Sequence, residues 1–249
     1  MSENHDAATA LKADISIAGI TIPDSKMTRD LTQLVRDTES ELLFHHSTRV
    51  YLFGALTGQR RGLKFDPELL YVGAMFHDMG LTESYRQSQN RFEVDSANAA
   101  RDFLRSYGIP ETSVELVWDA ISLHTTPGIP EHKKPEVALV TSGVEMDVLG
   151  LAYDQFTDEQ REAVVTAYPR GGDFKNEIIR SFYDGMKHRP DSTFGTVNDD
   201  VLARCDPAEF IPIRSLAARA PDAPGNYAMH SRFPSPGHGC PASTAESDL

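Results

Sequence analysis

The stretch YVGAMFHDMGLT, residues 71–82, places two adjacent ionisable side chains at the end of an apolar run. Gly80 follows them and is a natural helix C-cap, so we expect a helix to stop near that residue. Neighbouring residues of a helix point about 100° apart, so His77 and Asp78 can both reach one ion only where the backbone relaxes at a helix end. The stretch therefore predicts a helix that ends at a pair of candidate metal ligands.

Helical periodicity continues through residues 15–214, and Asp66 and Pro67 supply the N-cap and first turn of the helix that leads to His77. Alternating strand patterns are nearly absent, and 15–22 is the one short candidate. We therefore predict an all-α fold, a helical bundle. The expected helices cover about 31–53, 66–80, 94–107, 114–124 and 135–147, a stretch that begins with a capping box at Thr157, and 174–187.

Composition limits the class of protein. The chain has 249 residues, and 24 Lys and Arg against 37 Asp and Glu give a net charge of −13. This charge argues against non-specific nucleic-acid binding and against docking on anionic membranes, and we expect a small neutral polar substrate. Two cysteines exclude a disulfide scaffold, and the absence of a signal peptide or a long apolar run favours a cytoplasmic protein.

Three zones differ in composition along the chain. Residues 1–14 are small and polar, and we expect them to be disordered. Residues 15–214 carry nearly all of the periodic apolar pattern and form the predicted domain. Residues 215–249 are rich in Pro, Gly and Ser and are expected to form an extended tail. Whether the chain forms a homo-oligomer stays open.

Ionisable residues interrupt the apolar faces of four predicted helices: His46, His77 with Asp78, His124 and Asp147. One such histidine alone would be an ordinary hydrogen-bonded core residue. Five on one bundle favour a shared metal, because a metal offsets the cost of burying two carboxylates and orients the imidazoles. This ligand chemistry suits a transition metal better than calcium or magnesium.

The order His46, His77-Asp78, Asp147 resembles the H…HD…D pattern of the HD-domain metalloprotein superfamily. The likeness spans roughly residues 16–214, and within the superfamily the chain is similar to the cyanamide-hydratase-like branch. That similarity is carried by the stretch 71–82 and by the segments LLFHHSTRVYLFGALTG (42–58), FEVDSANAARDFL (92–104), LHTTPGIPEHKKPEVALV (123–140) and HRPDSTFG (188–195).

The resemblance implies that His46, His77, Asp78 and Asp147 bind one divalent transition metal, with zinc expected first and iron(II) as the alternative. Asp78 would also accept a proton from water. His124 would serve as proton shuttle, as a contact to substrate or as a fifth ligand.

Weaker candidates lie around this set. Thr82 and Glu93 flank the predicted metal ligands and are candidates for substrate binding, although an acidic residue also suits a first helical turn. Arg49 follows His46 by one turn and would either pair with a carboxylate of the site or lie on the surface. His132 would complete a two-metal set together with His124, or it is a solvated loop residue.

By the same resemblance, the leading expectation is a metal-dependent hydratase, in which metal-bound hydroxide adds to a small nitrile such as cyanamide and gives urea. One alternative is an HD-type phosphohydrolase acting on a nucleotide or a phosphomonoester, although few basic residues flank the motifs. Another alternative is a di-iron HD oxygenase, which would need the second metal. A non-catalytic binding module is the remaining alternative.

Overall fold

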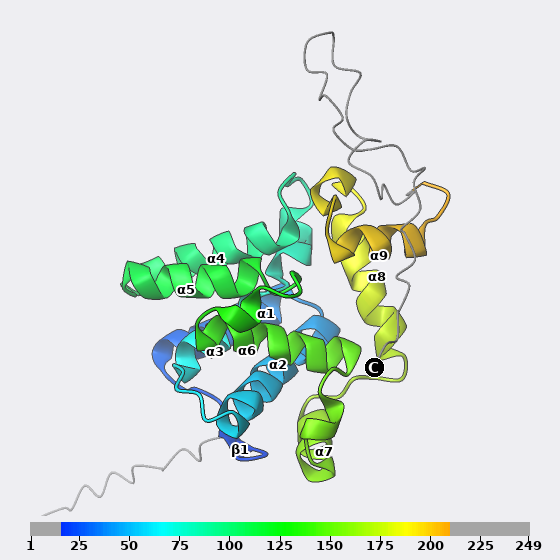
Figure 1. Ribbon diagram of the computed structural model, residues 1–249. Coiled ribbons are helices and arrows are strands. Elements are labelled where there is room, and N and C mark those ends of the chain that lie inside the picture. The colour runs from blue at the N-terminus through cyan, green and yellow to red at the C-terminus, as the bar shows by residue number, and fades with distance from the viewer. Residues whose placement is uncertain (1–15, 210–249) are drawn as a thin grey trace, which may run out of the picture. The chain divides into compact units, whose positions relative to one another are not determined.

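The computed structural model describes residues 16–209 and confirms the all-α class (Figure 1). Two-residue strands form a small antiparallel hairpin within the segment that was expected to be extended: β1 (Ser16–Ile17) and β2 (Ile20–Thr21). No helix of the described part is both long and apolar enough to cross a bilayer. The predicted disordered segment 1–14 and the predicted tail 215–249 lie outside the described residues.

The α-helices follow one another along the chain with short connections. They are α1 (Lys26–Thr38), α2 (Glu41–Arg60), α3 (Pro67–Phe76), α4 (Phe92–Ser106), α5 (Glu111–Ser122), α6 (Pro135–Val144), α7 (Asp158–Ala167), α8 (Phe174–Met186) and α9 (Val197–Cys205). A π-turn, Glu145–Leu149, continues α6, and a short 3-10 helix, Met79–Leu81, follows α3.

The predicted helix over 31–53 is wrong in one respect, because the structure divides it into α1 and α2. Ser40 is extended there, and its hydroxyl oxygen accepts a hydrogen bond from the Leu43 amide as the N-cap of α2. The interruption changes the helical phase. Within α1, Leu34, which the continuous pattern placed on the apolar face, is 40% exposed.

Close contact between α2 and α6 sets the centre of the bundle, where Figure 1 shows α2, α3 and α6 side by side. Two glycines permit it. A Cβ on Gly54 would lie 2.7 Å from the Leu139 carbonyl oxygen, and a Cβ on Gly143 would overlap the Val50 carbonyl oxygen. Both glycines therefore let the backbones approach closely, and this approach brings α2 against the helix that leads to Asp147.

The start of α3 has the predicted form, but its end does not, because Gly80, the expected C-cap, lies within the 3-10 helix Met79–Leu81. The Asp66 side chain caps its first turn, and the α-helix stops at Phe76, so that His77 lies at the C-cap. The backbone that follows is held against α4, because the Gly80 amide donates to the Ser96 hydroxyl oxygen at 2.7 Å. This contact fixes the helix end on which the adjacent His77 and Asp78 lie.

Candidate metal centre

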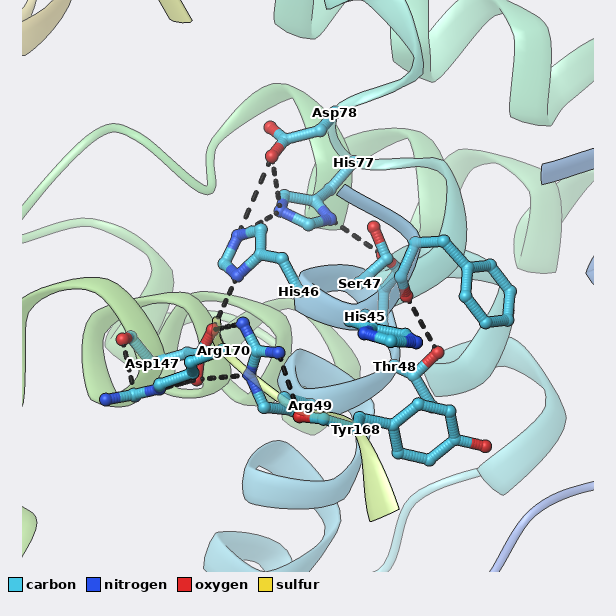
Figure 2. Close-up of polar contacts among 12 residues, drawn as sticks. His45, His46, Ser47, Thr48, Arg49, His77, Asp78, Asp147, Tyr168 and Arg170 are labelled. Carbon is cyan, nitrogen blue, oxygen red and sulfur yellow. Dashed lines mark hydrogen bonds and ion pairs between the residues drawn. The ribbon is translucent and has the colours of Figure 1, made fainter. Parts of the chain in front are cut away.

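The imidazoles of His46 and His77 converge with the Asp78 carboxylate in the buried interior (Figure 2). A third imidazole, that of His124, is buried beside Asp78. The Nε2 atoms of His46 and His77 are 3.2 Å apart. One oxygen of Asp78, Oδ2, lies 3.2 Å from His77 Nε2 and 3.6 Å from His46 Nε2. The other oxygen, Oδ1, lies 3.7 Å from His124 Nε2. Residues from α2, from the end of α3 and from the end of α5 thus direct donor atoms to one place.

Hydrogen bonds at the opposite ring nitrogens fix how these imidazoles are protonated. His77 Nδ1 donates to the Ala74 carbonyl oxygen at 2.7 Å, and His124 Nδ1 donates to the Ile121 carbonyl oxygen at 2.6 Å. A carbonyl oxygen only accepts, so both Nδ1 atoms carry hydrogen. In the neutral imidazole, each Nε2 therefore carries a lone pair that is directed at the centre, as a metal ligand requires.

A positive charge fits between these groups. Both oxygens of Asp78 and Nε2 of His124 are buried without a hydrogen-bond partner. Such atoms are costly unless something binds them. His46, His77 and Asp78 could together hold a metal ion. Three nitrogen donors and a carboxylate are ligands suited to zinc or iron.

The pKa shifts agree with a centre that attracts cations. Burial acts to raise the pKa of Asp78, but the facing histidines, His77 first, outweigh it and lower this pKa to about 2. Burial acts to lower the pKa of His77, but the Asp78 carboxylate outweighs it and raises that pKa. Burial, with His77 beside it, lowers the pKa of His124 to about 4. His124 is therefore neutral at pH 7, and its Nε2 is an acceptor.

Asp147 lies behind His46, at its other ring nitrogen. Its Oδ2 accepts a hydrogen bond from His46 Nδ1 at 2.7 Å. Arg49 donates to both oxygens, each at 2.9 Å, and Arg170 Nη2 donates to Oδ1 at 2.8 Å. The structure thus ties Asp147 to the site through His46, and the role of Asp147 as a direct metal ligand stays a prediction. The pairing of Arg49 with a carboxylate of the site is confirmed.

The two substrate-binding candidates differ in their surroundings. Thr82 is half-buried, and its hydroxyl donates to the Met79 carbonyl oxygen at 2.8 Å. Glu93 is buried and accepts hydrogen bonds from Arg91, Thr125 and Asn198. The oxygens of Glu93 are therefore already bound within the protein. Burial acts to raise the Glu93 pKa, but the hydrogen bonds from Arg91 outweigh it and lower this pKa.

His132 is exposed in a 3-10 turn, Pro130–His132, and it does not belong to the group of converging donor atoms found within residues 16–209. His124, by contrast, is buried beside Asp78. The described structure therefore does not bring His124 and His132 together as a second ligand pair.

Sequence reasoning missed three residues that shape the surroundings. Arg170 is half-buried in a loop and has no periodic neighbour to mark it as part of the site. Asn198 lies on α9, a helix that was not predicted. Arg189 is buried and pairs with Asp95, and it also donates to the Gly80 carbonyl oxygen behind the helix end.

Residues 43–163 match the family model of the HD domain. This segment contains His46, His77, Asp78, His124 and Asp147 in the expected order. No curated protein is significantly similar to the chain. The match covers just under half of the chain, so this segment is similar to an HD domain, a family whose members are in general metal-dependent hydrolases. The more specific likeness to one branch receives no support from the comparisons.

Proposed function

We propose that the chain is a metal-dependent hydratase acting on an uncharged nitrile such as cyanamide. The observation that carries this proposal is that the arginines nearest the centre are already paired. Arg49 and Arg170 bind Asp147, and Arg91 binds Glu93. A phosphorylated substrate needs positive groups on its oxygens. A neutral substrate needs none, so it fits these surroundings better.

The proposed cofactor is zinc, held by His46, His77 and Asp78 with His124 beside them. A divalent metal bound there would lower the pKa of water to about 7, so that a nucleophile would be available at neutral pH. The net reaction is H₂N–C≡N + H₂O → H₂N–C(=O)–NH₂. A C–O bond forms at the nitrile carbon as one C–N π bond is lost. Tautomerisation then replaces the second C–N π bond with C=O, and both water protons end on the former nitrile nitrogen.

The side chains of the chain supply orientation and proton transfer. Asp78 has two unpartnered oxygens that can accept the water proton and return it to the nitrile nitrogen. His124 is neutral, so we propose that Nε2 accepts a hydrogen bond or a proton from substrate or water, a narrower role than a shuttle that also donates at pH 7. Asp147 keeps the His46 ring in place through Nδ1.

A phosphohydrolase is the second candidate, because hydrolase activity of this kind is what the family match implies. The same converging ligands would serve it. A phosphohydrolase must bind a charged phosphate group, whereas the hydratase binds a neutral nitrile. A direct assay with both kinds of substrate therefore distinguishes the two functions.

The test incubates full-length protein of known metal content with cyanamide and measures urea, and in parallel with a nucleotide panel and p-nitrophenyl phosphate. We expect urea from the wild type, none from His77→Ala, and unchanged urea from His132→Ala, whose side chain is exposed outside the cluster. Phosphate release without urea would replace the proposal by the second candidate. Equal urea from His77→Ala and the wild type would remove the metal centre from the reaction.

A further inference from the structure

A cavity of about 360 Å³ adjoins the metal centre, and His124 lines it. Its walls come from the π-turn after α6, from α8 and from α9. The same histidine therefore faces two places, since its Nε2 lies 3.7 Å from Asp78 Oδ1 while its ring borders the cavity. A molecule in the cavity would therefore lie against the ring whose Nε2 faces Asp78.

Hydrocarbon dominates the walls of the cavity. They include Val144, Val148, Ile179, Phe182 and Val201. Aromatic contacts extend from the cavity wall to the candidate metal centre. The ring centroids of Phe182 and Phe92 are 5.6 Å apart in an edge-on contact, and those of Phe92 and His124 are also 5.6 Å apart. A chain of apolar contacts thus joins the cavity to the candidate ligand.

Polar groups of the lining are few, and they are already bound or lie at the edge. The Asn198 amide donates to Glu93 Oε1 at 2.9 Å. Lys175 is an exposed residue. Glu145 is half-buried, and its pKa is raised chiefly by burial. The interior therefore offers little to a small polar molecule beyond His124 and Thr125.

The size of the cavity decides which substrate fits. Each water occupies about 30 Å³, so 360 Å³ corresponds to roughly twelve water-sized groups. Cyanamide has only three heavy atoms and would leave most of the apolar surface in contact with water. Filling that surface with hydrocarbon is favourable by the hydrophobic effect. Cavities that bind whole organic ligands begin at about 300 Å³.

We propose that the substrate carries an aliphatic substituent, which occupies this cavity while the nitrile group lies at the metal centre. The inference rests on the proposed function for the chemistry of the head group. The net reaction is then R–C≡N + H₂O → R–C(=O)–NH₂, in which water adds across the carbon–nitrogen triple bond and nothing leaves. The substituent R is an unbranched or lightly branched chain, because the walls are aliphatic and Phe182 limits their spacing.

The test is a binding series that does not depend on turnover. Acetamide, butanamide and hexanamide, which are products of such a reaction, are titrated into full-length protein of known metal content by calorimetry. Burying one methylene group improves affinity about fourfold. We therefore expect hexanamide to bind on the order of 250-fold more tightly than acetamide, since it has four more methylenes. A flat series would overturn the proposal.

A pair of matched variants assigns the effect to the cavity. Val201→Phe fills it from α9, whereas Val165→Phe makes the same change at a half-buried valine of α7 that does not line it. We expect Val201→Phe to remove the gain for hexanamide and to leave acetamide binding unchanged, and Val165→Phe to keep the series intact. If both variants lose the tighter binding of hexanamide relative to acetamide, or if neither does, the proposal is also overturned.

The outcome is independent of the cyanamide assay. A steep binding series without urea formation would support the binding of an aliphatic ligand in the cavity and refute the hydratase proposal. Urea formation with a flat series would keep the hydratase and refute the aliphatic substituent.

Discussion

His46 and Asp147 meet at the ring nitrogen that does not face the metal centre, with 2.7 Å between Nδ1 and Oδ2. The same carboxylate binds Arg49 through two hydrogen bonds of 2.9 Å, and these groups are buried. Burial acts to raise the Asp147 pKa, but His46 first and Arg49 second outweigh it and hold this pKa well below its usual range, so the carboxylate is ionised. The carboxylate can therefore hold His46 in the tautomer whose Nε2 has a free lone pair for a metal ion.

Asp147→Asn should weaken metal binding without abolishing it. Loss of a hydrogen-bond partner behind a ligand typically costs 10- to 100-fold in metal affinity. The measurement is chelator competition on folded protein, with His77→Ala as the variant that removes a donor atom. If Asp147→Asn loses the metal as completely as His77→Ala does, the carboxylate is a direct ligand, as the sequence predicts.

Arg49→Met and Arg170→Met should differ in stability although both arginines bind Asp147. Arg49 is buried, and removing one partner of a buried ion pair costs about 3–5 kcal/mol. The Arg170 side chain is 33% exposed, so its loss should lower the free energy of unfolding by about 1 kcal/mol or less. Urea denaturation measures both values. Equal losses would show that Asp147 is not anchored mainly from α2.

Glu39→Gln should stabilise the protein increasingly as the pH rises. Burial, with Asp78 adding to it, raises the Glu39 pKa well above 4.5, although a hydrogen bond from Ser47 opposes the shift. The folded state thus keeps a proton that the unfolded state releases above pH 4.5. Stability due to this group is then present below that pH and falls as the pH rises toward the folded-state value, by up to about 1.4 kcal/mol per unit.

The measurement for Glu39 is the difference in melting temperature between the variant and the wild type at several pH values from 4.5 to 8. Glutamine has the same shape and no charge, so the difference isolates the titration of this one group. A difference that stays constant over the whole range would show that Glu39 does not have a raised pKa.

Gly143→Ala should destabilise the fold, and Gly172→Ala should not. A Cβ at Gly143 would overlap the Val50 backbone, whereas nothing lies within 4 Å of one at Gly172. Alanine favours helix by about 1 kcal/mol, but an overpacked contact with backbone costs about 1–3 kcal/mol or more and outweighs that gain. Thermal unfolding compares the two variants. A neutral Gly143→Ala would mean that α2 and α6 can separate without loss.

Elemental analysis should find one metal ion per chain. His132→Ala should leave that ratio unchanged, because His132 is exposed and lies outside the converging donors. His124→Ala should lower metal affinity, because its Nε2 faces Asp78. Two ions per chain, reduced to one by His132→Ala, would instead support the dinuclear alternative.

Much of the centre could be predicted because its residues interrupt apolar periodicity. His46, His77 and His124 lie on helix faces that are otherwise buried, and this placement depends only on local spacing. The start of α3 was also readable, since Asp66 and Pro67 mark it chemically, whereas Gly80 placed its end too late. Ser40 carried the signal for a helix start, but the periodic pattern on both sides of it suggested one continuous helix.

What could not be predicted depends on contacts between distant segments. The surroundings of Asp147 require Arg170, which is 23 residues away in a loop, and Arg49, which is 98 residues away. No local pattern reports which of several arginines meets a given carboxylate. The cavity is similarly non-local, because α8 and α9 form its walls, and α9 has too weak an apolar pattern to be identified alone.

The candidate donors and much of the cavity wall come from different parts of the chain. His46, His77, Asp78 and His124 all lie within the matched segment 43–163, whereas the walls from α8 and α9 follow it. Substitutions in these two helices can therefore change the size of the cavity without altering a donor atom. In an evolving lineage, substrate range could drift through the C-terminal helices while the reaction chemistry stays constant.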